Sequence, residues 1–207
     1  MRDAARPILE AIRQRRSIRR YLPDPVPEEL LTEVLTAATW APSAHNRQPW
    51  RFAVVRLQTV KERLAQAMGD RLRADLEADG VPAARIDADV SRSYRRLTSA
   101  PVLIVVCLTM ADMDNYPDER RQRNERVMAI QSTAMAGQNL LLAAHALGLG
   151  ACWLCAPLFV PGTVRDVLTL PAGWEPHGLI TLGYPAEVRS KTRQPLATSV
   201  RYLREGR

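Results

Sequence analysis

The strongest chemical signal in the sequence is the group of arginines in residues 15–21, which read Arg-Arg-Ser-Ile-Arg-Arg-Tyr. A guanidinium group is planar and donates two parallel hydrogen bonds to a phosphate or carboxylate, which a lysine ammonium does not do. Several guanidiniums and a hydroxyl in one short stretch therefore suit a phosphate monoester, which carries about two negative charges. Basic runs also lie solvated on surfaces or contact nucleic acid, so this stretch alone leaves those alternatives open.

A second stretch, residues 41–50, combines two prolines with short polar side chains and reads Ala-Pro-Ser-Ala-His-Asn-Arg-Gln-Pro-Trp. It stands between an expected helix and an expected strand, where loops on a rigid scaffold often carry function. Its hydroxyl and amide groups suit a heteroaromatic ring with alternating carbonyls and N–H groups. An ordinary polar loop built from turn residues has the same composition, and composition alone favours that simpler interpretation.

A third stretch, residues 147–157, reads Leu-Gly-Leu-Gly-Ala-Cys-Trp-Leu-Cys-Ala-Pro. Glycines after a long helix let the backbone approach a ligand closely, but they do not match the dinucleotide fingerprint, which opens a helix. The spacing of Cys152 and Cys155 is that of a redox motif, yet such pairs sit at a helix N-terminus. No second pair completes a zinc site, so we expect buried structural thiols and no metal.

Taken together, in this order and spacing, the three stretches resemble the nitroreductase family. The resemblance covers nearly the whole chain and continues into Gly-Tyr-Pro-Ala-Glu at 183–187 and a basic tail at 191–196. It implies an FMN-dependent oxidoreductase with an α+β fold, in which helices flank a central mixed or antiparallel sheet. It also implies an intertwined homodimer with two FMN sites at the subunit interface, acting on a small aromatic or conjugated acceptor.

The resemblance also assigns residues to the FMN site, and Arg19 is expected to favour the reduced ring, which carries negative charge near N1 and C2=O. Because the flavin itself transfers the hydride, no catalytic side chain is assigned. His45 is expected to touch the substrate. The cofactor residues are, for the phosphate and ring edge, Arg15, Arg16, Ser17 and Arg19, with the C-terminal pair Lys191 and Arg193; for the loop laid along the flavin by the second subunit, Pro42, Ser43, Ala44, Asn46 and Gln48; and for backbone facing the reactive ring, Cys155 and Ala156.

A narrower resemblance lies in Phe-Val-Pro at 159–161 and Leu-Pro-Ala-Gly-Trp-Glu-Pro at 170–176. These segments are similar to the nitroreductase-like C-terminal domain of the proteins that complete the deazaflavin coenzyme F-420, which implies a reductase of the dehydro precursor. Residues 48–50 are closer to generic nitroreductases. The alternatives are therefore a nitroreductase or quinone reductase using NADH, NADPH or another reduced donor, and a flavin-binding or deazaflavin-binding protein without turnover.

Composition restricts the class of protein further. The 207 residues, of which 46% are hydrophobic and 25% charged, are expected to form one domain over residues 1–207. No apolar run reaches the roughly 18 residues of a membrane span, and an odd number of cysteines favours a reducing compartment, so we expect a cytoplasmic protein. The net charge is +7, but a nucleic-acid site would need aromatics among the arginines, and Tyr21 alone is present.

The elements expected to position these stretches are helices and scattered short strands, which favours the α+β class because no regular βαβ repeat exists. Small apolar residues over 129–146 suggest a helix buried on two sides, as at a dimer interface. Alternating charges over 118–126 predict a solvated helix face, and the four tryptophans are expected in the core. The expected helices cover 8–14, 27–41, 60–97 with a break near 80–82, 125–147 and 164–168; the expected strands cover 52–55, 102–108, 151–154 and 179–182.

Overall fold

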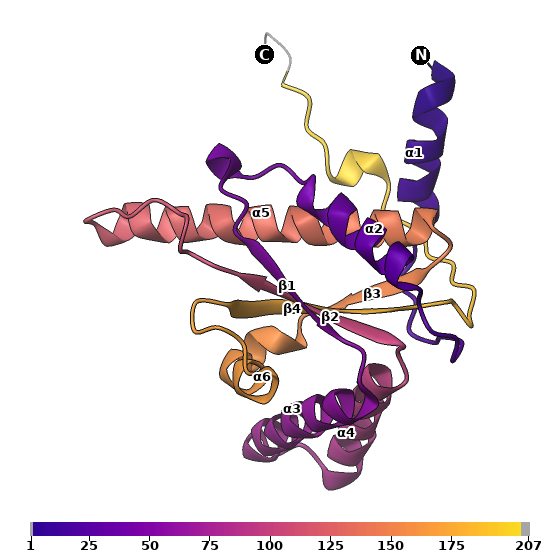
Figure 1. Ribbon diagram of the computed structural model, residues 1–207, viewed down its shortest axis with the longest axis vertical. Coiled ribbons are helices and arrows are strands. Elements are labelled where there is room, and N and C mark those ends of the chain that lie inside the picture. Colours follow the sequence, from indigo (N-terminus) through magenta and orange to yellow (C-terminus); the bar gives the residue numbers. More distant parts are fainter. Residues whose placement is uncertain (1, 204–207) are drawn as a thin grey trace.

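The computed structural model describes residues 2–203 and has a four-stranded sheet between two layers of helices (Figure 1). The strands lie in the order β1-β2-β4-β3, and every neighbouring pair is antiparallel. The expected α+β class with a central sheet flanked by helices is confirmed, and the sheet is antiparallel rather than mixed. The strands are β1 (Trp50–Val55), β2 (Val102–Leu108), β3 (Gly150–Leu154) and β4 (Glu175–Gly183).

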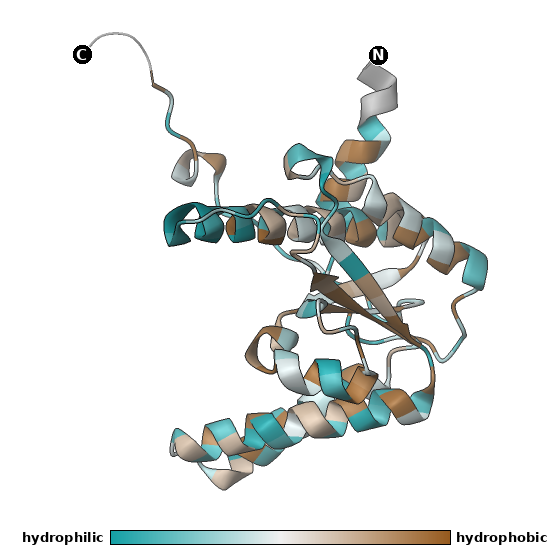
Figure 2. Cartoon of the chain, turned by 60° about the vertical axis from the view of Figure 1, so that its left-hand side comes forward, coloured by the Kyte–Doolittle hydropathy of each residue, from teal (hydrophilic) through white to brown (hydrophobic). Residues whose placement is uncertain are grey.

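Helices cover both faces of the sheet, with α2 and α5 on one side and α3, α4 and α6 on the other (Figure 1). The alternation of side chains along β2 explains the two layers: Ile104 belongs to the core under α2 and α5, and Val105 to the core under α3 and α4. Figure 2 shows hydrophobic strands in the centre of the molecule. The helices are α1 (Arg2–Gln14), α2 (Glu28–Thr39), α3 (Gln58–Ala78), α4 (Ala83–Thr98), α5 (Glu119–Ala146) and α6 (Pro161–Leu168), with short 3-10 turns at Ala44–Asn46, Ala156–Phe159 and Leu196–Thr198.

The long helix α5 begins six residues before its predicted start. Asp118 caps it, since its carboxylate accepts the backbone N–H of Arg121 at 2.9 Å. The prediction of a solvated face over 118–126 is wrong at Glu125, which is fully buried. Its Oε1 atom accepts the N–H of Asp114 at 3.1 Å, so the carboxylate holds the loop between β2 and α5 against the helix.

The tryptophans divide between core and surface. Trp153 lies between α5 and β4 at two glycines: a Cβ added at Gly137 would lie 2.2 Å from its ring, and one at Gly178 would lie 2.3 Å from it. Trp50 is buried as predicted, but Trp40 is 82% exposed, which contradicts the expectation of a core residue. Trp40 follows the last turn of α2, where Ala38 already occupies the inward position.

None of the helices within the described range combines the length with the apolar character that crossing a membrane requires.

Candidate functional site

The arginine stretch and the glycine-rich stretch lie side by side. After α1 the chain runs extended along β3, where Ser17 bridges to Ala151 and the N–H of Ile18 donates to the Ala151 carbonyl at 3.0 Å. Ile18 points into the core, and a Cβ at Gly150 would lie 2.8 Å from its side chain. The glycine therefore allows the two segments to approach, as a close backbone contact requires.

One end of this arrangement is a cluster of cations around Arg15. Burial, followed by repulsion from Arg193 and Arg16, lowers the pKa of Arg15, so the C-terminal segment lies within electrostatic reach of the arginine stretch. The Arg16 guanidinium donates to the carbonyls of Arg13 at 2.5 Å and Arg15 at 2.8 Å. Its Nε atom is buried and has no partner among the described residues. Lys191 is exposed in the same segment as Arg193.

The other end is a hollow of about 600 Å³ between the arginine stretch, the end of α4 and the segment after β4. The α4 contribution was not predicted, because the sequence of residues 60–97 indicates only a charged helical excursion. The signal was present in the spacing: arginines at 92, 95 and 96 share one helix face. The hollow, called the arginine pocket below, is lined by Arg19, Arg20, Arg92, Arg95, Arg96, Thr98, Ser99 and Arg189.

Cys152 connects the two ends. Burial raises the pKa of its thiol, while Arg19, a hydrogen bond from Ser17, Arg96 and Arg15 act in the opposite direction. The thiol thus lies within the field of both arginine groups. We call the group around Arg15, the arginine pocket, and the segment 15–19 that joins them along β3 the arginine cradle.

Glu187 holds the segment after β4 against the cradle. Its carboxylate accepts the backbone N–H of Arg19 at 2.7 Å and pairs with Arg189 at 2.8 Å. The hydrogen bond from Arg189 is the main reason that the pKa of Glu187 is lowered. The N–H of Ala186 also donates to the Arg20 carbonyl at 3.0 Å. This hydrogen bond fixes the backbone that carries Arg19 and Arg20 against the segment that carries Arg189.

The polar loop of residues 42–48 is conformationally strained. Three of the four non-glycine residues with positive φ in the described part of the chain lie in it: His45 at 49°, Asn46 at 54° and Gln48 at 50°. Each such residue costs about 1–3 kcal/mol and persists where surrounding contacts enforce it, typically at functional sites. Here the Gln48 N–H donates to Ser43 Oγ at 3.1 Å, and Arg47 forms an ion pair with Asp114.

This loop does not lie at the arginine cradle of its own chain. The N–H of Ala44 donates to Ser132 Oγ in the middle of α5 at 3.3 Å. Burial, and then Arg15 and Arg16, lower the pKa of His145 at the end of α5. Thirteen residues of helix separate Ser132 from His145, which is about 20 Å. Figure 1 shows α1 at the C-terminal end of α5, whereas the loop lies over the body of the helix. The structure therefore brings together two of the three stretches.

The remaining predicted residues lie where β3 ends. Cys155 follows the last residue of β3 and is exposed, so the expectation of a buried structural thiol is wrong for this residue and holds for Cys152. The chain turns there into a short 3-10 segment, and the strand no longer covers the thiol. Ala156 is half-buried in the first position of that segment.

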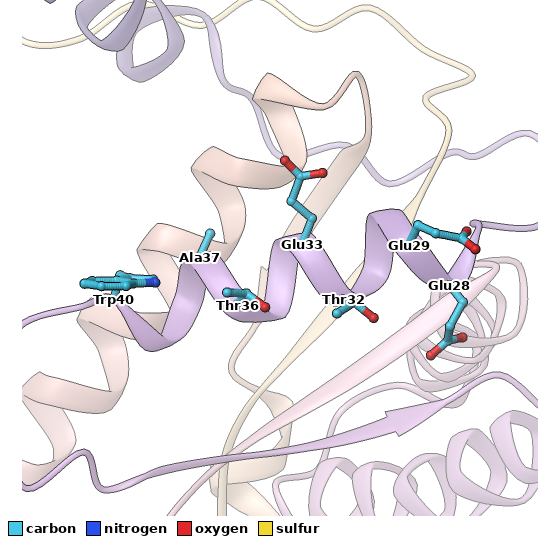
Figure 3. A pocket seen from close by; sticks show the side chains of 7 residues that line it. All are labelled: Glu28, Glu29, Thr32, Glu33, Thr36, Ala37 and Trp40. Carbon is cyan, nitrogen blue, oxygen red and sulfur yellow. The ribbon is translucent and has the colours of Figure 1, made fainter.

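A larger hollow, of about 670 Å³, runs along the outer face of α2 and has a different chemistry (Figure 3). Three glutamates, Glu28, Glu29 and Glu33, line it together with the exposed Trp40. Carboxylates repel a phosphate, so this groove does not suit the anionic ligand that the arginine cradle suits.

Comparisons with known proteins identify the family of the chain. The model of the nitroreductase family matches residues 12–184. A protein of Methanothermobacter thermautotrophicus, provisionally named an NADH dehydrogenase/NAD(P)H nitroreductase, is 36% identical over 183 residues, which are 87% of this chain and 78% of that protein. The 5,6-dimethylbenzimidazole synthase of Rhodospirillum rubrum is 34% identical over 188 residues, covering 86% of this chain and 82% of that one. A provisionally assigned nitroreductase from Desulfovibrio desulfuricans, solved in complex with FMN, is 33% identical with a TM-score of 0.73, covering 97% of this chain and 98% of the other.

Proposed function

The chain belongs to the nitroreductase family, and we propose that this oxidoreductase binds FMN, takes electrons from NADH or NADPH and passes them to a small aromatic or conjugated acceptor. The observation that carries the proposal is the arginine cradle, in which cations lie at both ends of the extended segment that runs along β3. FMN is similarly elongated and has its charge at its ends: a phosphate dianion, and a ring edge that becomes negative on reduction.

The donor set of the cradle fits FMN. We assign the phosphate to Arg15 and Arg193, with Lys191 nearby and the partnerless Nε of Arg16 as a further donor. Ser17 lies midway along the cradle, and Arg19 supplies the positive charge beside the ring edge. When bound, FMN supplies the hydride-transfer chemistry. The contribution of the chain is to bind it, to orient it, and to stabilise negative charge on the reduced ring.

We further propose that the site is completed by a second copy of the chain, with residues 1–207 forming one domain in each subunit. The strained loop of residues 42–48 lies about 20 Å along α5 from the Arg15 end of the cradle in its own chain, so we assign it to the partner's cradle. Apolar side chains exposed on the monomer support such an interface. They are Ile8 and Ile12 on α1, Trp40 after α2, Phe159, and Leu196, Tyr202 and Leu203 on the C-terminal segment, which runs away from the body in Figure 1.

The acceptor is less constrained than the cofactor. The relative from M. thermautotrophicus favours general NAD(P)H-dependent reduction. The synthase at 34% identity carries a different activity in its name, so identity at this level does not transfer a substrate. Reduction of the dehydro precursor of coenzyme F-420 stays a prediction from the sequence, as does contact of the exposed His45 with substrate.

The test is a visible absorption spectrum of the purified protein, followed by mass spectrometry of the material that heat releases. We expect a yellow protein that yields about one FMN per chain. Anaerobic mixing with NADH or NADPH should then bleach the flavin band, which separates an enzyme from a protein that only binds flavin. A colourless protein that also fails to take up added FMN would refute the proposed function.

A further inference from the structure

The arginine pocket contains more positive charge than its own carboxylates neutralise. Six guanidinium groups line it. Two of them have acidic partners: Arg92 pairs with Asp89, and Arg189 pairs with Glu187. The other four, Arg19, Arg20, Arg95 and Arg96, form no ion pair with any side chain that the structure describes, residues 6–203.

These like charges oppose one another at close range. Arg96 is half-buried at the end of α4, and burial, followed by repulsion from Arg19 and Arg92, lowers its pKa. A concave surface lined by one sign of charge raises the local concentration of counter-ions. The pocket is therefore built for an anion, and its hydroxyls at Thr98 and Ser99 add neutral hydrogen-bond donors.

The proposed FMN does not account for this charge. Its phosphate belongs to the Arg15 end of the cradle, and four residues of extended chain place Arg19 up to about 14 Å away. The ring edge carries about one negative charge when reduced, which Arg19 alone balances. Arg20, Arg95 and Arg96 are then left without a counter-ion.

We propose that the arginine pocket binds a phosphate group of the reduced dinucleotide, and that it selects NADPH over NADH through the 2′-phosphate. This inference rests on the proposed function. A phosphate monoester offers several acceptor oxygens to paired guanidinium donors. The volume of about 600 Å³ exceeds that of one phosphate and lies in the range of small-molecule sites, about 300–1,000 Å³, so an adenosine can accompany the phosphate. A phosphorylated acceptor would offer the same group, and the experiment distinguishes these two sources.

The experiment uses the FMN-loaded protein and two probes, adenosine 2′,5′-bisphosphate and adenosine 5′-monophosphate, measured by titration calorimetry. The variant is Arg20→Gln with Arg95→Gln, because both side chains are exposed and outside the FMN assignment. The control is Arg85→Gln with Arg123→Gln, which removes the same charge from exposed positions away from the pocket. Inorganic pyrophosphate serves as a third probe that carries charge without a nucleoside.

The wild-type protein and the control should bind the bisphosphate at least about tenfold more tightly than the monophosphate, and the variant should lose that difference. The ratio of kcat/KM for NADPH to that for NADH should fall by a similar factor. Equal binding of the two nucleotides by the wild type would overturn the inference. Pyrophosphate binding as tightly as the bisphosphate would assign the pocket to an anionic acceptor instead.

Loss of bound FMN from the variant would assign the pocket to the flavin and also refute the inference. A yellow protein that uses NADH and NADPH equally would refute the pocket assignment alone, whereas a protein that never takes up FMN would refute the proposed function itself. The two failures are therefore distinguishable.

Discussion

Removing both cations at the phosphate end of the cradle, Arg15→Ala with Arg193→Ala, should release FMN without unfolding the protein. Burial and repulsion between these two side chains already lower the pKa of Arg15. The flavin-free variant therefore loses an unfavourable repulsion between two cations. A hydrogen bond to a charged group contributes about 1.5–3 kcal/mol. Two lost phosphate contacts therefore predict a weakening of FMN binding by at least about 100-fold.

The assay is the ratio of flavin to protein absorbance after gel filtration, together with thermal unfolding with and without added FMN. A 100-fold weaker ligand removes about 2.7 kcal/mol of stabilisation, which is about 5–10 °C in the melting temperature of a domain of this size. We expect that loss in the FMN-saturated protein and an unchanged or raised melting temperature in the flavin-free protein. The exposed pair Arg85→Ala with Arg123→Ala is the control for charge.

The two expected changes differ: the melting temperature falls in the presence of FMN and stays the same or rises in its absence. A structural role for Arg15 and Arg193 would lower both melting temperatures together. Unchanged flavin occupancy in the double variant would show that the phosphate lies elsewhere, and the reasoning from the arginine stretch would then be wrong.

Three further predictions concern the scaffold. Asp114→Asn breaks the ion pair with Arg47. Because that pair is solvent-exposed, the free energy of unfolding should fall by at most about 1 kcal/mol. The KM for the acceptor, measured by steady-state kinetics, should rise several-fold because the strained loop loosens. Gly178→Ala places a Cβ 2.3 Å from the Trp153 ring and should lower the free energy of unfolding by about 1–3 kcal/mol, measured with denaturant. A variant as stable as the wild type would refute the close contact between Gly178 and Trp153. Burial is the main reason that the pKa of His177 is lowered in the folded protein. As the pH falls below about 6.5, His177 is therefore protonated in the unfolded chain before it is protonated in the folded one, and the free energy of unfolding should decrease. His177→Gln should flatten that dependence in melting curves recorded from pH 5 to about 7, and an unchanged slope would exclude this residue as the cause.

The sequence predicted the fold well where periodicity was strong. β2 was predicted with its observed bounds, since a continuous β-branched run has few alternative structures. The break between α3 and α4 fell at the predicted glycine and proline. β4 begins at Glu175, four residues before its predicted start, because Pro176 and Gly178 disfavour a strand in the sequence. The structure accommodates them through a bulge beside Cys107 and through the packing of Trp153 against Gly178. These are tertiary effects that no local pattern encodes.

Only part of the candidate site could be predicted from the sequence, and the reason is geometric. Candidate residues in one short segment, such as those at 15–19, can be identified from their residue types. The α4 arginines belong to the candidate site only because the end of that helix meets the arginine stretch. Glu125 was misassigned for the same reason, because its burial depends on the loop that carries Asp114. Sequence spacing identified which side chains share a face, but the partner of that face depends on the packing of distant segments.

The strained loop gives a reason to treat the proposed dimer and the proposed cofactor site together. Holding three left-handed residues costs free energy, and the hydrogen bonds that the Ser43 and Ser132 hydroxyls accept from backbone N–H groups only fix the shape. Within one subunit the loop packs against the middle of α5 and not against the Arg15 end of the cradle. In a twofold-symmetric dimer each contact is reciprocal, so a loop that reaches the partner's cradle implies a second loop that reaches back. Two cofactor sites would then form together, and a variant that prevents association should lose FMN from both subunits even though every arginine is intact.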